Sequence, residues 1–137
     1  MKALRWLPLT LIPVIAYNIM VFAFGGPDAN AWITATRFTI PLPLGGLWQV
    51  SAGDILLILT LFILFFELLK STSTSSVAMF DHIIATGVFI FCLVEFLVAY
   101  RAGTSVFFFI TIAALIDVIA GFTIGMRVAS RTLGVGV

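Results

Sequence analysis

The sequence contains very few charged residues. Seven basic and six acidic side chains make up 9% of its 137 residues, whereas about a quarter of the residues of a soluble domain are charged. With 62% hydrophobic residues and fourteen Phe, such a chain would have no polar coat in water. We therefore predict an integral membrane protein. The net charge of +1 gives no reason to expect nucleic acid as a partner.

Cysteine and histidine are almost missing. The single cysteine, Cys92, excludes an intramolecular disulfide, and its apolar surroundings predict a small buried side chain. The single histidine, His82, excludes metal sites with several histidines and paired axial haem ligands.

Motifs that carry common chemistry are missing as well. The chain has no C-x-x-C, no H-E-x-x-H and no phosphate-binding G-x-x-x-x-G-K-[ST] loop. Ser105 and His82 are expected on opposite sides of the membrane, so they cannot share a hydrolytic triad. We therefore expect no enzyme activity, no metal and no cofactor. One functional hypothesis is a lipid- or quinone-binding protein, which would require an apolar cleft.

Four long apolar runs dominate what is present, at about residues 4–24, 53–70, 77–100 and 105–127. Each approaches the roughly 20 residues that a membrane-spanning helix needs. We predict one domain over residues 1–137, an all-α antiparallel bundle of four transmembrane helices. The third and fourth helices, with a very short turn between them, form a helical hairpin. Pro13 is expected to bend the first helix.

The first run also resembles a cleaved signal peptide, because residues 29–31 read Ala-Asn-Ala, like a cleavage site. Its apolar part is longer than the usual 7–15 residues of a signal core, so we expect a retained helix instead.

Residues 25–52 form the only long segment with a polar character. Apolar side chains alternate with threonine or proline over residues 38–43, and a pair of glycines separates them from a second β-prone stretch. This pattern predicts a small β-hairpin between the first two helices, with its first arm weakened by proline. Ser51 and Asp54 have the spacing of a capping box at the start of the second helix. The hairpin is either a cap that lies on the bilayer or a docking surface for a partner.

Basic residues indicate the orientation. Four spans place both termini on one side, and five of the seven basic residues fall there: Lys2, Arg5, Lys70, Arg127 and Arg131. Only Arg37 and Arg101 fall on the other side. The excess predicts cytoplasmic termini and an extracytoplasmic hairpin. From the size and compactness of the chain we infer the inner membrane of a bacterium.

The intramembrane polar residues that we single out as candidates are Asn18, Glu67, Glu95 and Asp117. At about 1.5 Å per helical residue, Asn18 and Glu95 lie at one level near the outer surface, and Asp117 and Glu67 lie deeper. We predict an outer layer of Tyr17, Asn18 and Glu95, with Arg101 reaching back to it. An inner layer joins Glu67 and Lys70 to His82 and Arg127, with Asp117 about one turn above.

A stripe of small residues runs along the last helix at intervals of four: Ala113, Asp117, Gly121 and Gly125. Residues four apart share a helix face, and small residues let another helix approach closely. The stripe therefore predicts a close helix contact, either within the bundle or with a second subunit.

The intramembrane acids have two interpretations. They are either hydrogen-bonding groups that fix the helices in register, or a path for protons or cations. We expect a small non-catalytic accessory, assembly or scaffold subunit of a larger membrane complex. The alternative is a homo-oligomeric proton- or ion-coupled transporter or channel that uses Glu67, Glu95 and Asp117. The expected partners are the lipid bilayer and either another membrane protein or further copies of the chain.

Overall fold

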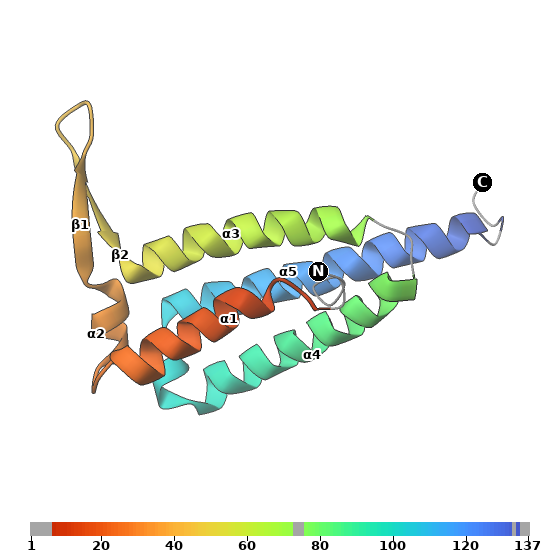
Figure 1. Ribbon diagram of the computed structural model, residues 1–137, viewed down its shortest axis with the longest axis horizontal. Helices are drawn as coiled ribbons and strands as arrows, with labels where there is room; N and C mark the ends of the chain where they lie inside the picture. The colour runs from red at the N-terminus through yellow and green to blue at the C-terminus, as the bar shows by residue number, and fades with distance from the viewer. Residues whose placement is uncertain (1–6, 73–75, 133, 135–137) are drawn as a thin grey trace.

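A computed structural model describes residues 7–72, 76–132 and 134, and most of them are helical (Figure 1). The elements in order are α1 (Leu11–Asn18), the π-helical η2 (Ile19–Phe24), α2 (Ala29–Thr34), β1 (Thr36–Pro41), β2 (Leu47–Ser51), α3 (Ala52–Ser71), α4 (Ser76–Val98), the short 3₁₀ turn η3 (Tyr100–Ala102) and α5 (Ser105–Thr132). Three segments are long and apolar enough to cross a membrane, namely Ala52–Ser71, Phe80–Val98 and Ser105–Arg127. Three of the four predicted runs are thus confirmed as helices of that kind.

The prediction for the first helix is wrong at its start. Residues 4–6 lie outside the described residues, and residues 7–10 form turns, so the helix begins at Leu11 instead of near residue 4. Helix α1 and η2 together span about 21 Å at 1.5 Å per residue, less than the roughly 30 Å of a bilayer core. Pro13 falls in the first turn of α1, where its missing N–H costs no helical hydrogen bond, so the predicted bend has no cause there.

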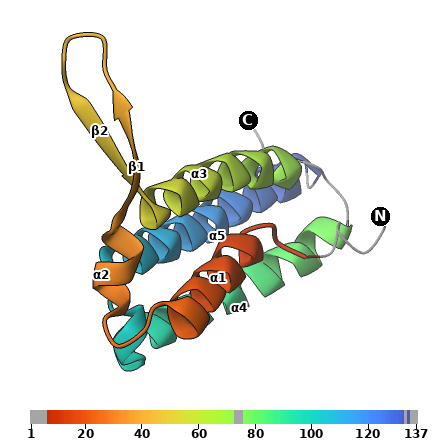
Figure 2. The same ribbon diagram turned by 60° about the vertical axis from the view of Figure 1, so that its left-hand side comes forward.

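Helix α5 is central. It packs along α3 on one side and along α4 on the other, and α1 lies across the space between α3 and α4 (Figures 1 and 2). The buried core includes Tyr17 in the last turn of α1, Val88 and Cys92 of α4, and Phe107 and Ile110 of α5. The ring centroids of Tyr17 and Phe107 are 4.5 Å apart. The core therefore concentrates at the end of the bundle that carries the α4–α5 turn.

The predicted hairpin is present as an antiparallel two-stranded sheet, which we call the ribbon (β1, β2 and the loop of residues 42–46). Gly45 has φ +85°, a conformation that favours glycine, and its N–H donates to the Leu42 carbonyl oxygen at 3.0 Å. The ribbon projects away from the helices, across their axes and past α3 (Figures 1 and 2).

Two helix N-caps flank the ribbon. Before β1, the Asp28 side chain accepts from the Ala31 N–H at 2.9 Å and caps the start of α2, a short helix that was not predicted from the sequence. After β2, the Ser51 side chain accepts from the Asp54 N–H, and the Asp54 carboxylate accepts from the Ser51 N–H at 2.8 Å. The predicted capping box is confirmed, so the chain passes from strand to α3 without a loop.

Helix α5 is longer than predicted. It continues to Thr132, whereas we predicted an end near residue 127, and its apolar part stops at Arg127. Backbone hydrogen bonds within a helix do not depend on a membrane, so the helix runs on past the last apolar turn.

Candidate functional site

The outer polar residues meet at the end of the bundle nearest the ribbon. Tyr17 is fully buried, and its hydroxyl donates to the Arg101 carbonyl oxygen at 3.2 Å. Its oxygen also lies 2.6 Å from the Thr104 hydroxyl. Arg101 thus contributes its backbone to this layer, and not the guanidinium group that we expected to reach back.

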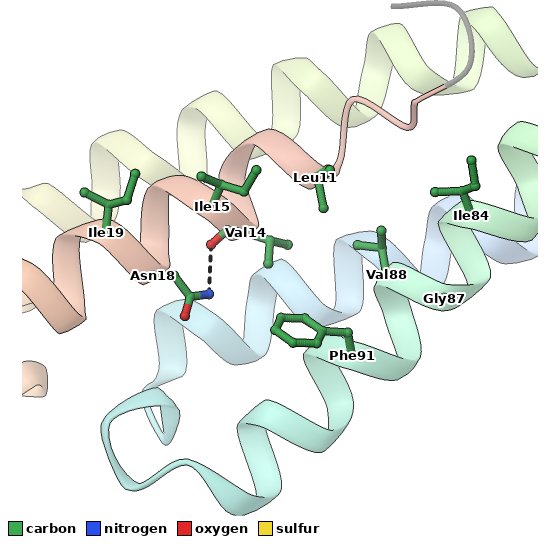
Figure 3. A pocket seen from close by; sticks show the side chains of 9 residues that line it. All are labelled: Leu11, Val14, Ile15, Asn18, Ile19, Ile84, Gly87, Val88 and Phe91. Carbon is green, nitrogen blue, oxygen red and sulfur yellow. Dashed lines mark hydrogen bonds between the residues drawn. The ribbon is translucent and has the colours of Figure 1, made fainter.

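Asn18 and Glu95 form the second part of the outer layer. The Asn18 amide nitrogen donates to the Glu95 carboxylate at 3.2 Å. It also donates to the Val14 carbonyl oxygen at 3.0 Å (Figure 3). Both side chains are half-buried. This contact joins α1 to α4, and it brings together two residues that helical rise had placed at one level.

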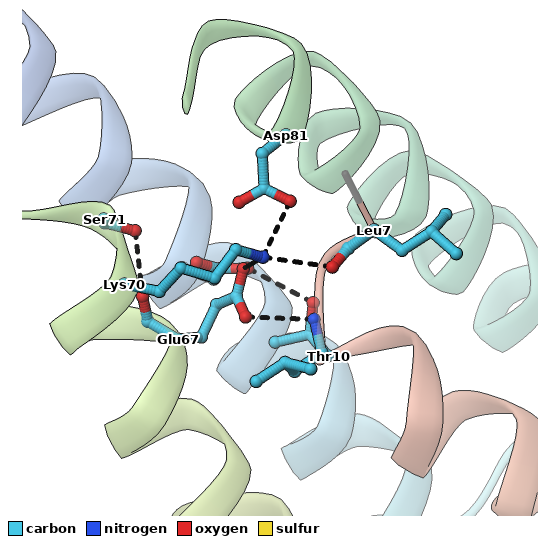
Figure 4. A network of polar contacts seen from close by, with 8 residues as sticks. Leu7, Thr10, Glu67, Lys70, Ser71 and Asp81 are labelled. Carbon is cyan, nitrogen blue, oxygen red and sulfur yellow. Dashed lines mark hydrogen bonds and ion pairs between the residues drawn. The ribbon is translucent and has the colours of Figure 1, made fainter. Parts of the chain in front are cut away.

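The inner polar residues meet around the Lys70 ammonium group, near the end of α3 (Figure 4). Its Nζ donates to the Glu67 carboxylate at 3.0 Å and to the Asp81 carboxylate at 2.9 Å. Glu67 is only 1% exposed and Asp81 is buried as well. One cation therefore holds a carboxylate of α3 and a carboxylate of α4 in a poorly solvated place.

The segment of residues 7–10, which we call the strap, completes this inner cluster. The Leu7 carbonyl oxygen accepts from Lys70 Nζ at 3.0 Å, and the Leu9 N–H donates to the second oxygen of Glu67 at 3.0 Å (Figure 4). Both peptide groups are thereby bonded to α3. The strap is thereby tied to α3, while its Pro8 and Leu9 carbonyl oxygens accept from the N–H groups of Leu11 and Ile12 at the start of α1.

Asp117, in the middle of α5, is held by the last residue of the strap. The Thr10 hydroxyl donates to its carboxylate at 3.2 Å, and both residues are buried. The inner cluster thus draws on the strap, α3, α4 and α5. Among the described residues it contains three carboxyl groups and one ammonium group, and Lys70 pairs with two of the carboxylates.

Most of the small-residue stripe of α5 packs against other parts of the same chain. Ala113 and Asp117 are buried, and a Cβ atom added to Gly121 would lie 2.6 Å from His82 Nδ1 of α4. Gly125 differs, because a Cβ atom there would meet nothing within 4 Å. The close contact at Gly121 is therefore the crossing of α4 over α5, and only the end of the stripe is open.

Two predicted members of the inner layer lie elsewhere. His82 packs against Gly121 and faces the Phe122 ring, with ring centroids 6.2 Å apart. Arg127 is exposed on α5. Among the described residues, no hydrogen bond joins either side chain to Glu67 or Lys70.

Asp81, Thr10 and the strap backbone belong to the inner cluster but were not predicted for the inner layer. A threonine close to Pro8 in an apolar run was the available signal, since proline interrupts a helix and frees polar groups for other partners. The backbone contacts gave no signal, because any residue type can make them.

The two layers are separate. In the described part of the chain, no side-chain hydrogen bond links Tyr17, Asn18 or Glu95 to the inner cluster. The described residues also contain no group of three or more His, Cys, Asp or Glu placed to hold a metal ion. What the geometry supplies is a set of cross-links between helices that are distant in sequence.

No family model, curated protein or solved structure matches this chain.

Proposed function

We propose that this chain is a small non-catalytic accessory, assembly or scaffold subunit of a larger membrane complex, and that the ribbon is the arm that contacts its partner. The observation that carries the proposal is the uncovered apolar face of the ribbon. Phe38 pairs with Val50 and Ile40 with Trp48, so these four side chains share one face. Val50 is buried at the base, but Phe38 is 49%, Ile40 38% and Trp48 44% exposed.

The opposite face of the ribbon is mixed. It carries the polar, exposed Thr39–Gln49 pair and the Pro41–Leu47 pair, in which Leu47 is 69% exposed. An isolated two-stranded hairpin is marginally stable in water, and an exposed apolar patch is typical of an interaction site. A partner surface that covers Phe38, Ile40 and Trp48 would stabilise the ribbon and bury this patch.

The base of the ribbon is fixed, so the arm is presented in one direction. The Arg37 guanidinium lies 4.5 Å from the centre of the Trp32 ring and donates to the Trp32 carbonyl oxygen at 3.1 Å. The capping box then ties the second strand to α3. This anchoring supports a docking arm more than it supports a loose loop.

The membrane arrangement that fits this role has α3, α4 and α5 crossing the bilayer, and the shorter α1 and η2 as the fourth apolar element. The ribbon would then run along the extracytoplasmic surface beyond α3. Both termini would lie in the cytoplasm, and the membrane would be the inner membrane of a bacterium. Arg127 and Arg131 at one end and Arg37 and Arg101 at the other follow the predicted charge bias. Lys2 and Arg5 lie outside the described residues.

A proton- or ion-coupled transporter is the alternative, and it has less support. Glu67, Glu95 and Asp117 each accept a hydrogen bond from a group of the same chain. Such bonds are what a role in holding the helices requires.

Native mass spectrometry after gentle solubilisation tests the proposal. The wild-type chain should be recovered with a different protein in fixed stoichiometry. A Phe38→Thr/Ile40→Thr variant should lose that partner, because it removes apolar surface while keeping strand-forming side chains. Gln49→Thr on the opposite face is the matched control and should keep it. Recovery of only the single chain or of homo-oligomers, or full retention of the partner by the double variant, would overturn the proposal.

A further inference from the structure

A cleft of about 590 Å³ lies between α1 and α4 (Figure 3). Its walls are apolar side chains of α1 (Leu11, Val14, Ile15 and Ile19) and of α4 (Ile84, Val88 and Phe91), together with Gly87 and Asn18. A Cβ atom at Gly87 would meet nothing within 4 Å. The absence of a side chain there leaves the α4 wall hollow opposite α1.

The cleft is open on one side, between two helices whose outer surfaces are apolar. In a membrane this opening faces hydrocarbon. Apolar walls do not hold ordered water, which needs two or more polar partners. An apolar chain is therefore the chemically suitable occupant for the body of the cleft.

A polar contact lies beside one end of the cleft. Ile84, Val88 and Phe91 lie at intervals of four and three along α4, and the next residue at that spacing is Glu95, just outside the lining. Asn18 of α1 lines the cleft and donates to one oxygen of the Glu95 carboxylate. Among the described contacts, no hydrogen bond reaches the other Glu95 oxygen or the Asn18 side-chain oxygen, and no basic side chain pairs with Glu95.

Two acceptor atoms, one on the lining residue Asn18 and one on its neighbour Glu95, define the chemistry of a ligand at this end of the cleft. A carboxylate at membrane depth favours a positively charged partner, and an amide oxygen accepts a hydrogen bond. The regular α1 also changes to the π-helical η2 at this point, and π-helical turns occur frequently at functional sites.

We propose that the α1–α4 cleft binds a single-chain amphiphile with a protonated amine head group. Its alkyl chain lies along Ile15, Ile84 and Gly87, and its ammonium group donates to Glu95 and Asn18. The volume is within the roughly 300–1,000 Å³ of small-molecule sites, whereas a partner helix would need a longer continuous face. An ordinary phospholipid chain would fill the walls and leave the Glu95 carboxylate without a cation.

Photolabelling of the full chain in phosphatidylcholine nanodiscs tests this site. The probe is dodecylammonium with a diazirine near the end of its chain, and the neutral comparison is the corresponding dodecanol. The ammonium probe should label residues 11–19 and 84–91, and unlabelled dodecylammonium should compete. Glu95→Gln should lower this labelling about tenfold at a sub-saturating concentration, since it removes a charged hydrogen-bond acceptor.

Gly87→Leu separates the cleft from the surrounding membrane surface. The leucine side chain would project into the cleft without meeting another atom at its Cβ, so it should abolish labelling while the helices stay intact. Gly125→Leu is the matched control, because Gly125 is also open but lies on α5, and it should label like the wild type.

Three results would overturn the proposal. One is labelling spread evenly over the apolar helix surfaces, or unchanged by Gly87→Leu. Another is equal labelling by the neutral probe with no effect of Glu95→Gln, which would identify an ordinary lipid chain as the occupant. The last is labelling of residues 11–19 and 84–91 that unlabelled dodecylammonium fails to compete away.

Discussion

The inner cluster and the ribbon differ in how they place polar and apolar groups. In the inner cluster, near the end of α3, Glu67, Asp81 and Asp117 are buried and Lys70 is partly buried, and each side chain accepts or donates a hydrogen bond within the chain. The ribbon carries apolar side chains out of the bundle and leaves them exposed. The described polar groups of the inner cluster thus have partners in the chain, whereas the ribbon has a surface that another molecule would complete.

This difference separates residues that stabilise the fold from residues that are available for binding. A buried ion-pair cluster loses stability when one member is removed, because the remaining buried charges are then neither paired nor hydrated. An exposed apolar face loses almost no stability when it is changed. Stability measurements on the chain alone, in detergent or nanodiscs, therefore separate the inner cluster from the ribbon.

The largest effect is expected from Lys70→Met at the inner cluster. It leaves the Glu67 and Asp81 carboxylates without their shared cation, which should cost about 3–5 kcal/mol of unfolding free energy. Unfolding by titration with a denaturing detergent, followed by circular dichroism, measures this loss. Arg127→Met removes an exposed basic residue of α5 and should change the unfolding free energy by less than about 0.5 kcal/mol. Equal stability of Lys70→Met and the wild type would show that the cluster does not hold the helices.

A smaller effect is expected where α4 crosses α5. Gly121→Leu forces a side chain against His82, which should cost about 1–3 kcal/mol through displacement of one helix from the other. Gly125→Leu, one turn along the same stripe, should be tolerated because its Cβ meets no atom. Size-exclusion chromatography with light scattering completes the comparison: a change of oligomeric state in Gly125→Leu would mean that the stripe contacts a second copy.

Asp117→Asn should alter the inner cluster only slightly. The asparagine oxygen can still accept from the Thr10 hydroxyl, so the unfolding free energy should change by less than about 1 kcal/mol. In proteoliposomes the wild type and the variant should show the same background permeability to protons and Na⁺. Wild-type flux that disappears in a folded Asp117→Asn variant would contradict the accessory role and support the transporter.

The smallest change in stability is expected at the ribbon. Phe38→Thr/Ile40→Thr should alter the unfolding free energy of the isolated chain by less than about 0.5 kcal/mol per site, because both side chains are exposed. Loss of the partner with unchanged stability would place these two residues in binding alone. A large loss of stability in the isolated chain would show instead that the ribbon is part of the folded core.

Local signals predicted much of the fold. The apolar runs gave three helices close to their observed bounds, and alternation with a glycine pair gave the ribbon. The capping box at Ser51 and Asp54 was also readable, since all its atoms lie within four residues. The shared level of Asn18 and Glu95 followed from helical rise alone.

Long-range contacts account for what the sequence did not reveal. The Leu9 N–H, just before α1, is bonded to Glu67, 58 positions away in the chain. Thr10 reaches Asp117 across 107 positions. The cleft is equally invisible in the sequence, because its volume depends on how far α1 and α4 stand apart and on the missing side chain of Gly87.

Photocrosslinking in native membranes tests the docking role of the ribbon most directly. A photoreactive phenylalanine derivative in place of Trp48 probes the face of Phe38 and Ile40, and the same substitution at the neighbouring Gln49 probes the opposite face. We predict a cross-link from position 48 to one different protein, and little or none from position 49. Cross-links from both positions alike, or from position 48 only to lipid or to another copy of this chain, would contradict it.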